Sequence, residues 1–370
     1  MTTGIGIVGC GNICEAYLSN LPRFPGLRLA GVADLDPGRA AAMAGRFDLA
    51  PFEVAALLAS DAVDIVLNLT TPAAHVELGL AALAAGKHVY AEKPLATDLS
   101  GGRRLLQAAE EAGLAVASAP DTFLGGAHQQ VRACLDGGGI GAPLGGTAFM
   151  LCPGHEGWHP GPAFYYARGG GPLFDMGPYY LTQLVNLLGP VAEIAGLSVR
   201  PRATRVVGSG PDAGREIPVE VDTHVTATLA FANGALVQMA MSFDVAATGH
   251  APFEIYGTAG TLEAPDPNRF GGPIRVNDGE GWRRIPVTRP FAEGNHRGLG
   301  LAEMARALER GTEPRASGGL ALHILEVMEL VGRAASERRV LPTTTAPPRP
   351  PAFDDPAGLA SPTAAREEGG

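Results

Sequence analysis

The chain has 370 residues, of which 46% are hydrophobic, and a formal net charge of −10. This length predicts two packed domains, and the acidic balance leaves no basic face for nucleic acid. The sequence holds no uninterrupted apolar run of about 18 residues, the length of a membrane span. The first residues lead directly into a predicted strand without a basic signal segment. We therefore expect a cytoplasmic protein that binds neither nucleic acid nor membrane.

The cysteines do not show the spacing of a metal site or of a disulfide framework. Two of them flank a glycine loop and two lie far along the chain, at Cys10, Cys14, Cys134 and Cys152. We expect free thiols in a reducing compartment and no bound metal.

A glycine-rich loop follows the first predicted strand, in Ile5-Gly6-Ile7-Val8-Gly9-Cys10-Gly11-Asn12-Ile13-Cys14. A side chain at Gly9 or Gly11 would hold a pyrophosphate away from the backbone amides and from the N-terminus of the next helix. The third small residue of the usual fingerprint is Cys14 here, and a tight turn alone also needs glycine, so a purely structural loop stays open. The loop on its own indicates a dinucleotide site.

A second predicted strand, at 27–34, ends in Asp34, where a carboxylate accepts hydrogen bonds from ribose hydroxyls. Arg39 offers a charge for a 2′-phosphate, but Asp34 and Asp36 lie beside it. Asp36, followed by Pro37, is typical of a helix cap. Asp34 therefore favours NAD over NADP.

Strands and helices alternate up to about residue 120, with buried strands predicted at 64–69, 86–91 and 114–119 and helices at 73–85 and 97–113. This pattern predicts a Rossmann-type, doubly wound parallel sheet, whose ligands lie at the carboxyl ends of the strands. We assign residues 1–122 to this dinucleotide-binding domain.

From about residue 123 the pattern changes to helices at 126–136, 175–188, 301–308 and 320–331 and to strands that alternate polar and apolar residues. Two strands, at 223–231 and 236–243, flank Asn233-Gly234, a strong hairpin signal. We expect an α+β domain at 123–341 with an open, mainly antiparallel sheet. Its uncovered face predicts a homo-oligomer, a dimer or tetramer. Residues 342–370 are rich in Pro, Thr and acids, which predicts a disordered tail.

Three residues are candidates for acid–base chemistry. Lys93 ends a strand beside Pro94 and can polarise a substrate hydroxyl, although a surface lysine paired with Glu92 is an equal alternative. Asp175 and Tyr179 are four apart on one helix face, and Pro178 places the helix start near Asp175, which a simple N-cap would also explain. A tyrosine is a poor base at neutral pH, so we expect catalysis to need Lys93 beside it. A core role for Tyr179 stays open.

The loop Gly154-His155-Glu156-Gly157-Trp158-His159-Pro160 suits a sugar pocket, because aromatic faces stack on C–H groups and polar tips bind hydroxyls. Its histidines are four apart, but Gly157 and Pro160 disfavour the helix that a zinc motif needs. Expected substrate contacts are Trp158, His159, Tyr165, Arg168 and the three acid–base candidates.

The glycine loop, the segment from Asn68 to His75, the Glu92-Lys93-Pro94 triplet and the glycine-rich Asp175 helix occur in one order and spacing. In these features residues 4–340 resemble the glucose-fructose oxidoreductase, inositol dehydrogenase and rhizopine-catabolism (Gfo/Idh/MocA) family. Many members carry His four residues after the Asp, whereas Tyr179 here is similar to the glucose-fructose oxidoreductase branch.

The resemblance implies NAD(P)-dependent oxidation or reduction of a sugar, cyclitol or related polyol. It implies that Lys93, Asp175 and Tyr179 are catalytic. It also implies that the cofactor contacts are Gly9, Gly11, Asn12, Ile13, Asp34, Thr71, Pro72, His75, Glu92 and Lys93. His75 can equally orient its loop. Two alternatives stay open: a redox-neutral sugar enzyme that retains NAD and cleaves glycosides through a transient ketone, and a non-catalytic sugar or nucleotide sensor.

Overall fold

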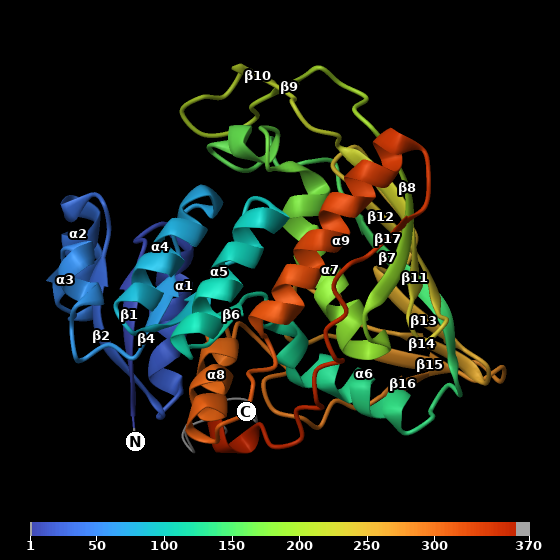
Figure 1. Cartoon of the computed structure of the whole chain (residues 1–370). Helices are drawn as coiled ribbons and strands as arrows, with labels where there is room; N and C mark the ends of the chain where they lie inside the picture. Colours follow the sequence, from blue (N-terminus) through green and yellow to red (C-terminus); the bar gives the residue numbers. More distant parts are fainter. Residues whose placement is uncertain (1, 360–370) are drawn as a thin grey trace. The chain divides into compact units, whose positions relative to one another are not determined.

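The computed structural model of the chain describes residues 2–359 (Figure 1). Its described residues form two compact units: unit 1 holds residues 2–129, 288–325 and 350–359, and unit 2 holds residues 130–287 and 326–349. Each unit therefore combines separate stretches of the sequence, whereas the domains that we expected were continuous. The units are described one at a time below.

Unit 1 contains a six-stranded sheet in the order β3-β2-β1-β4-β5-β6, in which every pair of neighbours is parallel. Its central strands are buried and rich in Ile and Val, as the doubly wound pattern requires. The strands are β1 (Thr3–Val8), β2 (Leu27–Ala33), β3 (Pro51–Phe52), β4 (Ile65–Asn68), β5 (His88–Ala91) and β6 (Val116–Ser118). The predicted Rossmann sheet is confirmed.

Two helices of unit 1 begin at aspartate caps, one of them the Asp36 cap that the sequence predicts. Asp36 accepts a hydrogen bond from the Gly38 amide (2.9 Å), and Asp98 accepts one from the Gly101 amide (2.8 Å). Figure 1 shows α4 and α5 side by side. The helices are α1 (Asn12–Asn20), η1 (Leu21–Arg23), α2 (Pro37–Phe47), α3 (Val54–Leu58), α4 (Pro72–Ala84), α5 (Leu99–Ala112), η2 (Thr122–Leu124), α8 (Leu299–Glu309) and η4 (Ala357–Leu359).

Unit 2 contains a nine-stranded sheet in the order β16-β15-β14-β13-β7-β12-β11-β8-β17. Only the β7–β12 pair is parallel, which confirms the expected mainly antiparallel sheet. Its strands are β7 (Pro143–Leu151), β8 (Val191–Val199), β11 (His224–Phe231), β12 (Leu236–Ser242), β13 (Phe253–Gly257), β14 (Gly260–Glu263), β15 (Ile274–Asn277), β16 (Trp282–Ile285) and β17 (Leu341–Pro342). A separate pair, β9 (Thr204–Val206) and β10 (Glu216–Pro218), forms a small second sheet.

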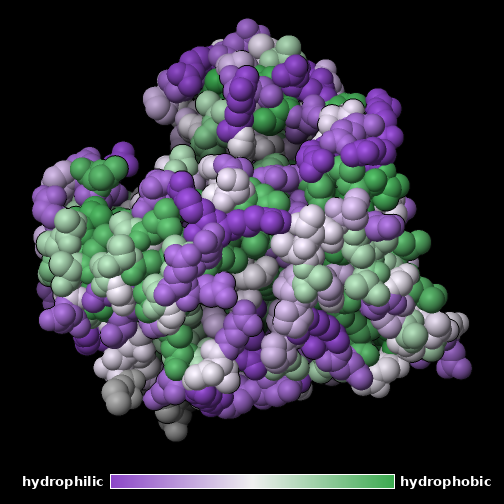
Figure 2. All heavy atoms as spheres, in the orientation of Figure 1, coloured by the Kyte–Doolittle hydropathy of each residue, from purple (hydrophilic) through white to green (hydrophobic). Residues whose placement is uncertain are grey.

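One face of the large sheet packs on helix α7 (Gly171–Leu188), which contacts β7, β11 and β12. Buried and exposed residues alternate along β11 and β12, and Leu197, Val199 and Leu236 are each more than half exposed. The remaining elements are α6 (Gly126–Asp136), η3 (Pro162–Tyr165) and α9 (Gly318–Glu337). On the side of the molecule seen in Figure 2, apolar side chains are interspersed with polar ones.

The start of α7 corrects one expectation. The helix begins at Gly171 and not near Asp175, with Gly170 as its N-cap and Pro172 in its first turn. Pro178 lies inside the helix, which therefore tolerates a missing backbone N–H at that point. Asp175 is a residue of the helix and not its cap.

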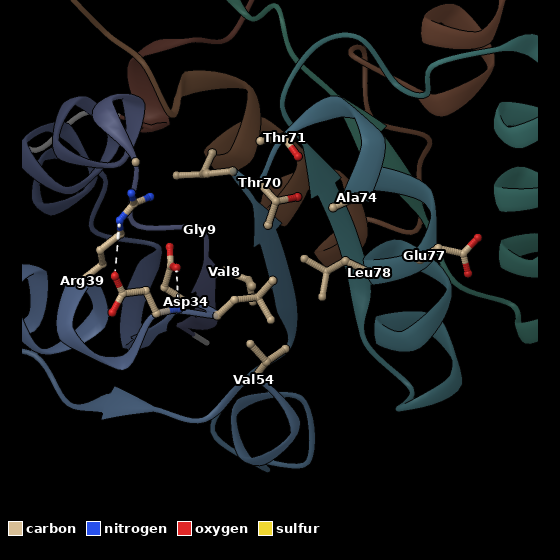
Figure 3. Close-up of a pocket in the computed structure, with 14 residues that line it drawn as sticks. Val8, Gly9, Asp34, Arg39, Val54, Thr70, Thr71, Ala74, Glu77 and Leu78 are labelled. Atoms are coloured by element: carbon tan, nitrogen blue, oxygen red, sulfur yellow. Dashed lines mark hydrogen bonds and ion pairs between the residues drawn. The ribbon is translucent and has the colours of Figure 1, made fainter.

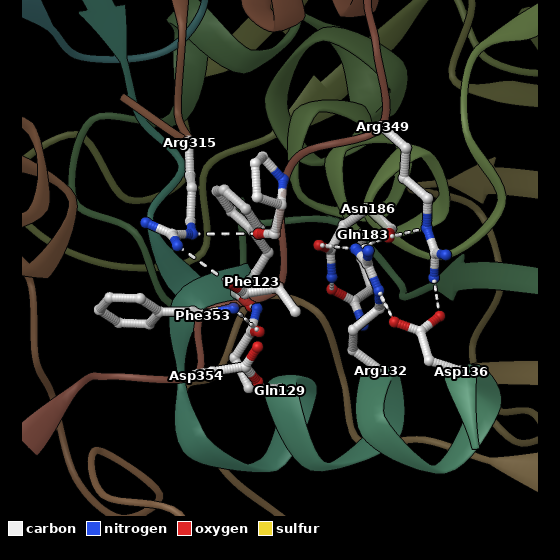
Figure 4. A network of polar contacts seen from close by, with 12 residues as sticks. Phe123, Gln129, Arg132, Asp136, Gln183, Asn186, Arg315, Arg349, Phe353 and Asp354 are labelled. Carbon is white, nitrogen blue, oxygen red and sulfur yellow. Dashed lines mark hydrogen bonds and ion pairs between the residues drawn. The ribbon is translucent and has the colours of Figure 1, made fainter. Parts of the chain in front are cut away.

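The segment after β17 differs from the disordered tail that we expected from residue 342. In unit 2, Glu326 accepts hydrogen bonds from the backbone amides of Thr344 and Thr345 (both 2.8 Å), and Arg349 pairs with Asp136 at 2.8 Å. In unit 1 the Phe353 amide donates to Gln129 (2.9 Å), and Figure 4 shows Phe353 beside Gln129 and Arg349 beside Asp136. The segment thus offers donors that match acceptors on other helices, which its composition does not reveal. Residues 360–370 of the expected tail lie outside the described residues.

Within residues 2–359, the helices are all too short or too polar to cross a membrane.

Candidate functional site

A cavity of about 540 Å³ lies in unit 1 at the carboxyl ends of β1, β2 and β4 (Figure 3). The loops after these three strands and the first turns of α4 line it. This is the edge at which a doubly wound sheet binds ligands. Six of its lining residues belong to the predicted dinucleotide site or lie beside it, namely Gly9, Gly11, Asp34, Asp36, Thr70 and Thr71.

The two loop glycines differ in what they do for the fold. Gly9 has a φ of +105°, and a Cβ there would lie 2.6 Å from the backbone carbonyl of Leu69, so the chain itself requires glycine. Gly11 is the N-cap of α1 with a φ of −79°, and a Cβ there would meet no protein atom within 4 Å. The fold does not need glycine at position 11, so the open space above it is free for a ligand at the helix N-terminus.

Asp34 is fixed by the two loops that it joins. One carboxylate oxygen accepts a hydrogen bond from the Cys10 amide (2.7 Å) and the other from the Asp36 amide (2.9 Å). Each oxygen keeps a lone pair for a hydroxyl group. Arg39 forms an exposed ion pair with Asp36 at 3.6 Å, so its charge already has a partner.

Asn12 and Ile13 form the first turn of α1, while Thr71 and Pro72 open α4. His75 lies deeper, 1% exposed, with Nδ1 2.8 Å from the Pro94 carbonyl and Nε2 3.1 Å from the Thr70 carbonyl. Burial lowers the pKa of His75, and the two carbonyl contacts oppose this shift. These two contacts join the segment after β4 to the segment after β5.

Glu92 is buried, and both of its oxygens bind neighbouring groups. The Tyr17 hydroxyl donates to Oε1 (2.9 Å) and the Lys93 backbone amide to Oε2 (3.0 Å). The half-buried Lys93 follows the end of β5 and is joined to Pro94 by a cis peptide bond. Glu92 therefore holds the backbone at Lys93 and joins it to Tyr17.

In unit 2, α7 carries Asp175 and Tyr179 one turn apart. The Asp175 carboxylate lies 3.4 Å from Nε2 of His155, and the two side chains are 19% and 14% exposed. Tyr179 is 7% exposed. Tyr180, the competing tyrosine, instead donates to Asp266 (3.2 Å), and burial raises its pKa well above the usual value.

The aromatic loop surrounds His155. Its ring centroid is 4.3 Å from that of Tyr165 and 5.4 Å from that of Trp158, and the His159 ring lies 5.4 Å from each of the same two rings. Arg168 is exposed, and its backbone amide donates to Glu220 (3.3 Å). The structure thus brings the predicted substrate residues Trp158, His159 and Tyr165 together around His155, the partner of Asp175.

A buried arginine that the sequence reasoning missed holds this loop. Arg205 of β9 is 3% exposed, contacts Glu156 at 2.7 Å and Asp244 at 2.5 Å, and donates to the Phe243 carbonyl at 3.0 Å. Glu156 also accepts a hydrogen bond from Tyr166. These bonds lower the pKa of Glu156, although burial opposes them, so it is an ionised anchor of the loop. Since its partners are far apart in sequence, no local pattern signals this network.

Across residues 2–359, no group of three or more His, Cys, Asp or Glu side chains is arranged to hold a metal ion.

Two family models match the chain. Residues 3–119 match the oxidoreductase family with an NAD-binding Rossmann fold, and residues 128–263 match the GFO/IDH/MocA C-terminal domain. The chain belongs to the Gfo/Idh/MocA oxidoreductase family. This membership confirms the resemblance, an enzyme of the oxidoreductase class and NAD as cofactor.

The chain is 27% identical over 323 residues to a 1,5-anhydro-D-fructose reductase of Ensifer adhaerens, covering 85% of this chain and 90% of that one. It is also 27% identical over 303 residues to inositol 2-dehydrogenase 3 of Saccharopolyspora erythraea, covering 77% and 80%. A solved NAD-binding oxidoreductase from Klebsiella pneumoniae has a TM-score of 0.82 at 22% identity, covering 93% of this chain and 99% of that chain. This last similarity confirms the fold.

Proposed function

We propose that this protein transfers hydride between NAD and a hydroxyl or ketone carbon of a sugar, cyclitol or related polyol. The cofactor part of this proposal rests on the open space at Gly11. This space lies at the N-terminus of α1, in the same cavity as Asp34. The substrate half rests on the aromatic loop and on the relatives, whose names refer to an anhydrosugar and an inositol.

We assign the cofactor contacts as follows. Backbone amides at Gly11, Asn12 and Ile13 bind the pyrophosphate, and Asp34 accepts the ribose hydroxyls. Asp34 and the Arg39–Asp36 pair favour NAD over NADP, because a 2′-phosphate would meet two carboxylates. Bound NAD supplies the acceptor for the hydride.

We assign the proton chemistry to side chains of this chain. Tyr179 takes the proton of the substrate hydroxyl, and Lys93 stabilises the negative charge that develops on that oxygen. Asp175, with His155 against its carboxylate, binds a neighbouring hydroxyl and fixes the sugar ring. Glu92 and His75, which the resemblance placed among cofactor contacts, act on the backbone around Lys93 and Thr70 instead.

The exposed apolar residues of the open sheet face, Leu197, Val199 and Leu236, support our further proposal of a homo-oligomer through this face. Light scattering after size-exclusion chromatography of the wild type and of a Leu197→Glu variant tests it. A monomeric wild type would contradict it.

The function is tested by following absorbance at 340 nm with NAD or NADP and a panel of sugars, cyclitols and sugar acids. We expect NADH formation with at least one polyol in the wild type, and its loss in Lys93→Ala and in Tyr179→Phe. NAD that is released only on denaturation, without turnover, would favour the redox-neutral enzyme. Absence of both turnover and cofactor binding would favour the sensor.

A further inference from the structure

The rings of the loop at 155–165 divide into an inner and an outer group. His155 and Tyr165 form the inner group, with His155 against Asp175. Trp158 and Phe164 form the outer group, and their side chains are 62% and 57% exposed. His159 lies between the outer rings, 5.4 Å from Trp158 and 5.5 Å from Phe164 between centroids. We call these three outer residues the aromatic shelf.

We propose that the aromatic shelf is a second saccharide subsite, so that the substrate carries a second sugar ring beyond the ring that reacts. This inference rests on the proposed function, because it takes the reacting ring to lie at Asp175. His155 joins the two places: it contacts Asp175 at 3.4 Å and has its ring 5.4 Å from that of Trp158. The shelf is therefore continuous with the candidate catalytic residues and extends outward from them.

An ion pair, a hydrogen bond and close packing fix the loop that carries the aromatic shelf. Glu156 contacts the buried Arg205 at 2.7 Å, and its carbonyl accepts a hydrogen bond from the Gly208 amide at 2.7 Å. Close packing adds to this, because a Cβ on Gly210 would lie 2.8 Å from the Cβ of Pro160. Exposed rings on a pinned loop lose little conformational freedom when a ligand binds.

The charges around the shelf favour a saccharide over a nucleotide sugar. Arg205 already has Glu156 and Asp244 as partners, and Arg202 lies 3.9 Å from Asp244. The positive charge of Arg202 and Arg205 is thus matched by carboxylates. Aromatic faces flanked by an imidazole suit a sugar ring, whose C–H face stacks while its hydroxyls bind polar tips.

The two tryptophans of the chain allow a direct binding test. Trp282 lies in β16 under Arg275 (5.0 Å from guanidinium to ring centroid), outside the shelf. In a Trp282→Phe variant, Trp158 is the sole tryptophan, and in the matched control Trp158→Phe it is Trp282. Both are titrated with cellobiose, maltose, lactose, their constituent monosaccharides and dTDP, with NAD present.

We expect the disaccharides to change Trp158 fluorescence at concentrations at least tenfold below those of the monosaccharides, with no change in the control. Phe164→Ala should weaken disaccharide binding and leave monosaccharide binding unchanged. Equal responses to mono- and disaccharides, or no response to any saccharide, would overturn the proposal. A response to dTDP alone would assign the shelf to a nucleotide sugar, and a signal that follows protein concentration would assign it to a second copy of the chain.

A Trp158 response without hydride transfer in the 340 nm assay would leave the subsite standing and refute the dehydrogenase. Hydride transfer from monosaccharides alone, without a change in Trp158 fluorescence, would support the dehydrogenase and refute the second subsite.

Discussion

A Gly11→Ala substitution tests NAD binding at the glycine loop without disturbing the fold. The φ of −79° suits alanine, and the added Cβ meets no protein atom within 4 Å. Alanine is a poorer N-cap than glycine, which costs at most about 1 kcal/mol of stability. A methyl group above the N-terminus of α1 would, however, occupy the space assigned to the pyrophosphate. We expect the Kd for NAD to rise at least about tenfold, equal to about 1.4 kcal/mol.

The assay is calorimetric titration with NAD, beside urea unfolding of the same variants. Gly332→Ala is the matched control, because it adds the same methyl group in open space on α9 and should stabilise that helix by about 0.5–1 kcal/mol without affecting NAD. Gly9→Ala should unfold the chain, since its Cβ would lie 2.6 Å from the Leu69 carbonyl. A Gly11→Ala protein that binds NAD as the wild type does would refute the cradle.

Three further predictions concern buried charged or titratable side chains. Glu92→Gln should lower kcat, because Glu92 accepts a hydrogen bond from the Lys93 amide. The Kd for NAD should stay within about twofold (0.4 kcal/mol) of the wild-type value. Steady-state kinetics measures the first effect and calorimetry the second. Arg205→Met removes the buried cation between Glu156 and Asp244 and should cost about 3–5 kcal/mol in urea unfolding. Arg202→Met, which removes an exposed guanidinium 3.9 Å from Asp244, should cost under about 1 kcal/mol, and equal losses in the two variants would contradict this. Burial lowers the pKa of His296 to about 4. The unfolded chain therefore takes up this proton below about pH 6.5 while the folded chain resists it, so up to about 3 kcal/mol of stability is lost as the pH falls from 6.5 to 4. A His296→Gln protein with an unchanged pH slope would exclude this residue as the cause.

The sequence predicted the parts of the molecule that depend on local chemistry. The glycine loop, the strand ending at Asp34 and the Asp36 cap are each readable within a few residues, and the structure places them together at the cavity. Position 178 was misread because proline was taken to mark a first helical turn, whereas Pro172 occupies that turn. The segment at 343–353 was misread because its acceptors, Glu326 and Gln129, are remote in sequence.

The aromatic loop needed tertiary information for the same reason. Its composition predicted a sugar pocket, but the role of each side chain depends on Arg205, which no spacing connects to Glu156. The pair with Arg205 identifies Glu156 as an anchor of the loop, and the contact with Asp175 adds His155 to the candidate site residues.

In both units, several carboxylates already bind backbone amides or an arginine side chain, which limits the groups that can act as acid or base. In unit 1, Glu92 binds the Lys93 amide, and the buried Asp121 accepts from the Gly298 amide at 2.9 Å, so both carboxylates hold backbone in place. In unit 2, Glu156 and Asp244 neutralise Arg205. Carboxylates committed in this way cannot also exchange protons with a substrate without loosening the segment that they hold. This favours our proposal that Tyr179 takes the substrate proton, with Lys93 stabilising the developing charge and Asp175, beside His155, binding a neighbouring hydroxyl.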